Sequence, residues 1–136
     1  MTYAVSFALQ EAVYGALIAD ATLAAEIGSD IFDAPPSGTI PSTYVLIGDE
    51  VVVNQSAKTS AGAFHDFVVN VVSDEAGFST AKQVAGAVCD ALVDQPLTLS
   101  RGQLVGLHFR SARALREDSP GIRQINLKFR AIVEDS

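Results

Sequence analysis

The sequence has no tryptophan, one methionine and a single cysteine, Cys89. One cysteine excludes an intramolecular disulfide and any metal site built from several thiolates. Long apolar runs are also missing: no stretch approaches the ~18 apolar residues of a membrane helix. Met1 is not followed by a basic segment and then an apolar one, as in a signal peptide. We therefore expect a protein with no membrane partner, made in the cytoplasm without processing.

Enzyme signatures are equally scarce. The sequence has no glycine-rich phosphate loop, nucleophile elbow or metal-ligand spacing. His65 and Asp66 are neighbours, so on a strand they point to opposite faces and cannot pair. His108 belongs to another predicted strand and could approach His65 or Cys89. We predict no catalytic, cofactor-binding or metal site and favour structural roles for these residues; a small enzyme or ligand-binding domain using both histidines is the alternative.

Basic residues are rare in the first hundred positions. Residues 1–100 hold two lysines against 12 acidic residues, a net charge of −10, whereas residues 101–136 hold seven bases against four acids, a net charge of +3. The whole chain has a net charge of −7 and a pI near 4.6. It is therefore a poor candidate for binding nucleic-acid phosphates. A chain with so uneven a charge distribution is suited to binding a second copy of itself, with the acidic part of one copy against the basic part of the other. The acid pairs Asp49–Glu50 and Asp74–Glu75 are expected to be solvated in turns.

About half of the 136 residues (49%) are hydrophobic. That content excludes disorder and suffices for one domain, residues 1–136, with a single core. The first 27 residues are predicted to form two helices. Asp20 is expected to cap the second helix, and Gly28 is expected to end it. The apolar stripe of the first helix consists of Val5, Leu9, Ala12, Val13, Ala16 and Leu17.

Strand patterns dominate the rest of the chain. The predicted elements are a short strand at 31–34, strands at 44–47, 51–53 and 64–73, a helix capped by Ser79 or Thr80 and ending near Val93, and two long strands at 104–116 and 123–133. The last strand alternates cleanly, with Ile125, Leu127, Phe129, Ala131 and Val133 facing inward. The order α, α, β, β, β, α, β, β predicts an α+β fold: an antiparallel sheet with helices packed mainly on one face.

Cations cluster in this final pair of strands. Strand spacing puts Arg110 and Arg116 on one face and Arg113 on the other, unless a bulge near Ser111–Ala112 brings them together. The cluster is either the solvated face of a hairpin, where charge prevents stray edge pairing, or an ionic contact surface for a neighbouring copy. The candidate interface residues are Arg110, Arg113, Arg116, Arg123, Lys128 and Arg130.

Two segments are predicted to form neither a helix nor a strand. Pro35–Ser42 begins with the break Pro35-Pro36-Ser37-Gly38, and Asn54–Gly62 is small and polar, so we predict a loop at each. Each is either a passive link or a contact surface that orders against a partner. The candidate contact residues are Thr39, Ile40, Asn54, Gln55, Lys58 and Thr59.

Taken in order, these elements resemble the tail-terminator (tail-completion) family of long-tailed bacteriophages and gene transfer agents. The resemblance spans nearly the whole chain, although each motif alone is an ordinary helix or strand pattern. The residues that carry it include Ala8-Leu9-Gln10, Ala12-Val13-Tyr14, Ile31-Phe32-Asp33-Ala34, Tyr44-Val45, Ile47-Gly48, Gly77-Phe78, Asp90-Ala91-Leu92, Leu104-Val105 and Val133-Glu134-Asp135.

The resemblance implies a virion structural protein at the head–tail junction, synthesised in a bacterial host. Such proteins form a homo-oligomeric, six-membered ring on the tail tube protein, stop its polymerisation and meet the head–tail connector or stopper protein. DNA passes through the lumen without specific binding. The alternatives within the virion are a head–tail stopper or adaptor and a tube subunit. A tube subunit is disfavoured here because it needs long stacking hairpins, and only the C-terminal hairpin is strongly predicted.

Overall fold

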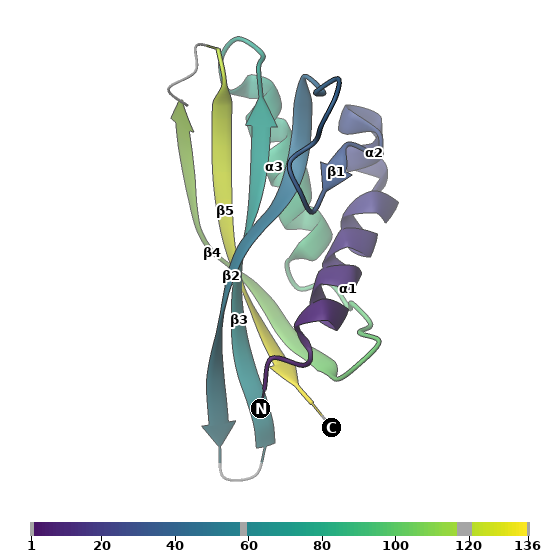
Figure 1. Cartoon of the computed structure of the whole chain (residues 1–136), viewed down its shortest axis with the longest axis vertical. Helices are drawn as coiled ribbons and strands as arrows, with labels where there is room; N and C mark the ends of the chain where they lie inside the picture. Colours follow the sequence, from purple (N-terminus) through teal and green to yellow (C-terminus); the bar gives the residue numbers. More distant parts are fainter. Residues whose placement is uncertain (1, 58–59, 117–120, 136) are drawn as a thin grey trace.

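The computed structural model describes residues 2–57, 60–116 and 121–135, and its elements follow the predicted order (Figure 1). They are α1 (Ser6–Ala19), α2 (Ala21–Ile27), β1 (Ile31–Phe32), β2 (Thr43–Ala57), β3 (Ser60–Ser73), α3 (Ser79–Leu92), β4 (Gln103–Arg116) and β5 (Arg123–Glu134). The strands form one sheet in the order β1-β2-β3-β5-β4. All neighbours are antiparallel except the short β1, which runs parallel to β2. The α+β prediction is confirmed, with the helices on one side of a mostly antiparallel sheet.

The helix boundaries match the sequence signals at one junction and differ at another. The Asp20 carboxylate accepts a hydrogen bond from the Leu23 amide at 3.0 Å, so it caps α2 as predicted. Gly28 ends that helix with a φ of +63°, which glycine adopts without steric cost. The predicted cap of α3 is wrong: the N-cap position is Phe78, which makes no side-chain capping bond.

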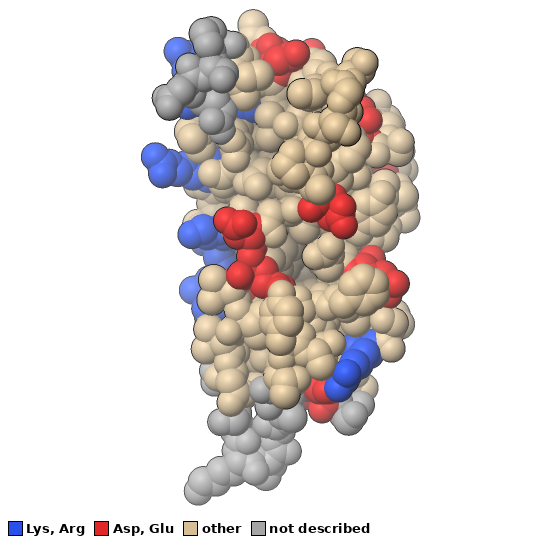
Figure 2. Space-filling model, viewed as in Figure 1, with Lys and Arg blue, Asp and Glu red and all other residues tan. Residues whose placement is uncertain are grey.

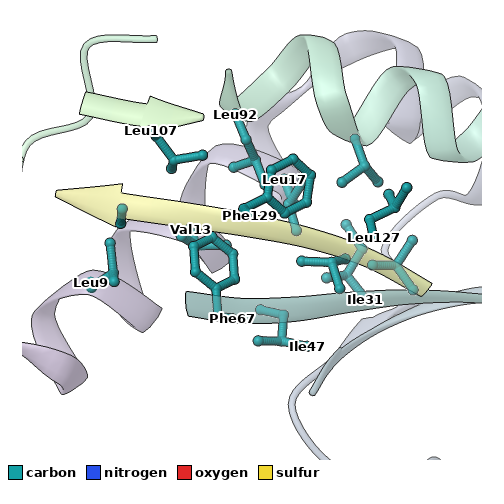
Figure 3. Close-up of a cluster of buried hydrophobic side chains, with 14 of the residues drawn as sticks. Leu9, Val13, Leu17, Ile31, Ile47, Phe67, Leu92, Leu107, Leu127 and Phe129 are labelled. Atoms are coloured by element: carbon teal, nitrogen blue, oxygen red, sulfur yellow. The ribbon is translucent and has the colours of Figure 1, made fainter. Parts of the chain in front are cut away.

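The core lies between the helices and the sheet. Phe129 is fully buried at its centre and stacks on Phe67 at 5.5 Å between ring centroids (Figure 3). Leu9 and Leu17 of α1 and Leu92 of α3 are buried around these rings. Every inward residue predicted for the last strand is buried, because β5 lies near the middle of the sheet and has α3 packed over it.

The predicted loop at Asn54–Gly62 is wrong as far as the structure describes it. Asn54 pairs with Ala63, and Gln55 pairs with Gly62, within one long hairpin formed by β2 and β3. Antiparallel pairing satisfies the backbone hydrogen-bonding groups whatever the side chains are, so a polar segment can extend a hairpin begun by apolar residues. The premise that only the C-terminal hairpin is strong is therefore wrong as well.

A β-bulge lies near mid-length in each of β2 and β4. One falls between Ile47 and Glu50 in β2, and the other falls between Phe109 and Ser111 in β4. Bulges increase the local right-handed twist and re-aim side chains. In Figure 1 the sheet is strongly twisted, so that its strands overlap in the view near the middle and are seen separately above and below.

Candidate interface surfaces

The bulge in β4 decides where the arginines point. Beyond it, Ser111 pairs with Lys128 and Arg113 pairs with Asn126, so Arg113 lies on the same face of the sheet as Lys128. That face is turned away from the helices. Arg110 lies at the bulge itself and lines the same face.

Arg116 pairs with Arg123 on the opposite, helix-side face. The strand-spacing prediction, which put Arg110 with Arg116, is therefore wrong. The bulge lies one residue before Ser111, and it groups Arg110 with Arg113 instead.

Two of the six basic residues predicted to form the interface make contacts within the chain. Arg130 donates two hydrogen bonds to Asp66, at 2.8 and 3.0 Å, and its guanidinium stacks 4.4 Å from the centroid of the Phe64 ring. These hydrogen bonds hold the pKa of the Asp66 carboxyl below its usual value. Arg123 stacks on Phe78 at 5.5 Å and donates to the Glu75 carbonyl. Arg130 and Arg123 therefore help to hold the fold together.

The other four cations, Arg110, Arg113, Arg116 and Lys128, are exposed. Arg110 and Lys128 line a groove of about 660 Å³ that crosses the outer face of the sheet near the mid-length of its strands. The β2 and β3 side of this groove carries Asp49, Glu50 and Asp66. Figure 2 shows acidic residues near the middle of this view and basic residues along the edge where β4 lies. The opposite charges found in the sequence are thus separated across the sheet.

A buried polar cluster ties the N-terminal segment to the bulge in β2. The Glu50 carboxylate accepts hydrogen bonds from the Tyr3 hydroxyl and from Ser6 Oγ, the latter at 2.6 Å. Its other oxygen lies 3.5 Å from Nδ1 of His65, which is fully buried. Burial raises the pKa of Glu50, but the hydrogen bonds from Ser6 and Tyr3, together with the nearby His65 ring, outweigh it and leave the pKa below its usual value.

The prediction that Glu50 is solvated in a turn is wrong. Sequence reasoning missed it because the run on either side, Ile47 to Val53, gives no sign of which residue the bulge turns inward. The hydrogen bonds from Tyr3 and Ser6 hold the N-terminal segment against β2 and β3.

The residues of the enzyme alternative are not brought together. His65 pairs with Ala131 on the helix-side face, whereas His108 pairs with Arg130 and is exposed on the outer face. Cys89 is half-buried on α3, and burial raises the pKa of its thiol, which keeps it protonated and weakly nucleophilic.

Within the described ranges, no group of three or more His, Cys, Asp and Glu side chains is placed to hold a metal ion. Across the same residues, every helix is too short or too polar to cross a membrane.

The candidate contact segments lie toward opposite ends of the long axis (Figure 1). Thr39 and Ile40 are exposed in the connection that leads into the start of β2, and Ile40 is 60% exposed. Asn54 is exposed near the far end of β2, with Gln55 beyond it in the hairpin. Lys58 and Thr59 lie outside the described residues.

The comparison with protein families and the comparison with solved structures agree with each other. The family model described as "Tail completion protein gp17" matches residues 11–134. Matching solved structures number 26 chains. One of them belongs to a structure titled "Virion of native gene transfer agent (GTA) particle"; it is 55% identical, with a TM-score of 0.92, and the match covers 98% of this chain and 99% of that chain. No curated protein gives a significant match.

Proposed function

We propose, given that the chain belongs to the tail completion protein gp17 family, that it closes the end of a phage-type tail tube as a ring and joins the tail to the head–tail connector. Family membership gives the coarser role, a structural protein of a virion tail. The observation that carries the proposal is the likeness, in sequence and fold and over nearly the whole chain, to a chain of an assembled virion.

A closed ring of six identical copies needs a heterologous contact, in which one patch of each subunit meets a different patch of the next. The charge distribution supports this arrangement. Exposed Arg110 and Arg113 lie on β4 at one edge of the sheet, whereas exposed Asp49 lies on β2 toward the other edge. Unlike charges on opposite edges favour head-to-tail association and disfavour like-to-like pairing.

The ends of the subunit are proposed to make the axial contacts. The β2–β3 hairpin extends to one end of the long axis, and the connection that contains Thr39 and Ile40 reaches toward the other. One end would meet the tail tube protein, and the other would meet the connector. DNA would pass through the ring without specific binding, which suits a net charge of −7.

The test is the distribution of tail lengths in particles from a strain that lacks the gene, measured by negative-stain electron microscopy. Overlong or ragged tails without heads are expected, and the wild-type gene supplied in trans should restore normal tails. Tails of normal length that fail to join heads would overturn the tube-stopping role and favour a head–tail stopper. Complete, normal particles would contradict a structural role at the junction.

A further inference from the structure

Helix α1 is apolar on the side that faces solvent as well as on the side that faces the core. Phe7, Tyr14 and Ile18 are 73%, 40% and 36% exposed, and their spacing of seven and eleven residues places them on one face of the helix. Glu11 is exposed beside them and is the one charged residue of α1. We call these four residues the α1 stripe. A helix that is apolar all round belongs in an interior, so we expect something to cover this stripe in the assembly.

The opposite flank of the molecule carries an open apolar groove. Helix α3 packs over β3 and β5 and leaves the helix-side face of β4 uncovered from Phe109 to Ala114. The result is a groove of about 320 Å³, formed by Phe109, Ala112 and Ala114 of β4 together with Cys89 and Lys82 of α3. We call it the α3–β4 groove. Its small alanines leave room for large side chains, and Lys82 is the one charged residue that lines it.

The two surfaces match in polarity and in charge. The α1 stripe presents large apolar side chains and one negative charge, and the α3–β4 groove presents an apolar lining that includes three alanines, together with one positive charge. They do not overlap, because α1 lies at one flank of the subunit and the later half of β4, which lines the groove, lies at the other (Figure 1). One copy can therefore use both surfaces at once, as a head-to-tail ring requires.

We propose that the α1 stripe of one copy docks into the α3–β4 groove of the next copy, with Glu11 facing Lys82. This inference rests on the proposed ring and specifies its lateral contact. The neighbouring α1 fills the position over β4 that the subunit's own helices leave empty. The contact covers Phe7 and Phe109, two of the most exposed aromatic side chains described.

The chain's own cysteine provides the test, because Cys89 lines the groove. The Tyr14→Cys variant, incorporated into particles and treated with a short bifunctional maleimide, should cross-link to Cys89 of the next copy. Denaturing electrophoresis should then show a ladder of multiples that ends at the number of copies in the ring. Ile18→Cys, at the least exposed position of the stripe, provides a second site if Tyr14→Cys is not incorporated.

Two matched controls define the result. Tyr14→Cys combined with Cys89→Ala should give no ladder. Lys128→Cys, on the outer face of the sheet, should give none with Cys89 intact. Incorporated variants at Tyr14 and Ile18 that both fail to cross-link, or an equal ladder from Lys128→Cys, would overturn the proposal.

A charge exchange tests the pairing separately. Glu11→Lys and Lys82→Glu should each reduce complementation of the deletion strain, and the double variant should recover most of it. A double variant no better than the worse single variant would show that the two side chains do not face each other.

The outcomes also separate this inference from the proposed function. A ladder in particles tests the lateral contact, whereas tail length in the deletion strain tests the terminating role. Either can fail while the other holds.

Discussion

Strands β4 and β5 form one hairpin, yet their environments differ sharply. β5 alternates mainly between buried and partly exposed residues along its length, whereas ten of the 14 residues of β4 are exposed. Phe129 of β5 is fully buried, and Phe109, its partner across the hairpin, is 46% exposed. Both strands carry apolar residues on the helix-side face. The difference arises because α3 packs over β5 but does not extend over the exposed part of β4.

In the isolated chain, whether a sheet residue is buried depends more on whether a helix packs over it than on whether its side chain is apolar. A sheet edge with apolar residues left uncovered is a hazard for a monomer. In a protein that assembles, the same edge is a binding surface. Paired substitutions, one at a covered position and one at its uncovered neighbour, put the comparison to the test.

The largest difference is expected between the two phenylalanines. Phe129→Ala should lower the free energy of unfolding by about 3–5 kcal/mol, because it leaves a cavity in the centre of the core. Phe109→Ala should cost roughly 1 kcal/mol, since about half of its area stays in water. Urea denaturation of both variants measures the difference. Equal losses would mean that α3 does not set the boundary between the two strands.

The next largest difference is expected between Glu50 and Asp49. Glu50→Gln should cost about 1–3 kcal/mol at neutral pH, because it weakens the acceptor for Tyr3, Ser6 and His65 in a partly buried cluster. Asp49→Asn should change stability little, because its side chain is exposed.

The pH dependence follows from the same cluster. The pKa of Glu50 is lower in the folded chain than in the unfolded chain, so its contribution is present above the unfolded pKa and is lost as pH falls through the folded pKa. Urea denaturation between neutral pH and about pH 3 should show that the free energy of unfolding falls less steeply with decreasing pH in Glu50→Gln than in the wild type. An unchanged acid dependence would contradict this assignment.

A smaller difference is expected between Arg130 and Lys128. Arg130→Ala removes a two-bond pair with Asp66 and should lower the free energy of unfolding less than Glu50→Gln does, because both groups are partly in water. Lys128→Ala, on the same strand and exposed, should stay within about 0.5 kcal/mol of the wild type. Repeating both measurements at high salt should shrink the Arg130 effect, and an Arg130 effect that grows with salt would count against the ion pair.

The smallest effect on stability is expected at Arg113. Arg113→Glu should change the free energy of unfolding by less than about 0.5 kcal/mol, because the side chain is exposed. It should nevertheless reduce incorporation into particles, since it reverses charge at the basic edge of the sheet. Quantitative mass spectrometry of purified particles measures incorporation. Wild-type incorporation at low salt would show that the edge charges do not guide assembly.

Periodicity in the sequence was enough to predict the order of the elements and the inward residues of β5. The predictions failed where non-local pairing decides the structure. The extension of the β2–β3 hairpin depends on backbone pairing between Asn54 and Ala63, and no side-chain pattern signals it. The bulge beside Phe109 changes which arginines share a face, and its position depends on the partner strand.

The proposed contact surfaces were partly visible in the sequence. Phe7, Tyr14 and Ile18 have helical spacing. The sequence alone already explains the apolar character of α1 by its inner stripe, which packs in the core. That a second set of apolar residues faces solvent becomes clear only from their exposure in the structure. The α3–β4 groove depends on how far α3 reaches across the sheet, which is a tertiary property. Cys89, for which the sequence favours a structural role, is half-buried and lines that groove.

The most direct test of the central claim, that a second copy covers the β4 flank, is the alkylation rate of Cys89 in the unmodified protein. The rate with N-ethylmaleimide is measured by mass spectrometry for the isolated chain, with its monomeric state checked by light scattering, and for the protein in purified particles. We predict much slower alkylation in particles, because the neighbouring α1 closes the groove, and equal rates after denaturation. Equal rates in the native monomer and in native particles would contradict the claim.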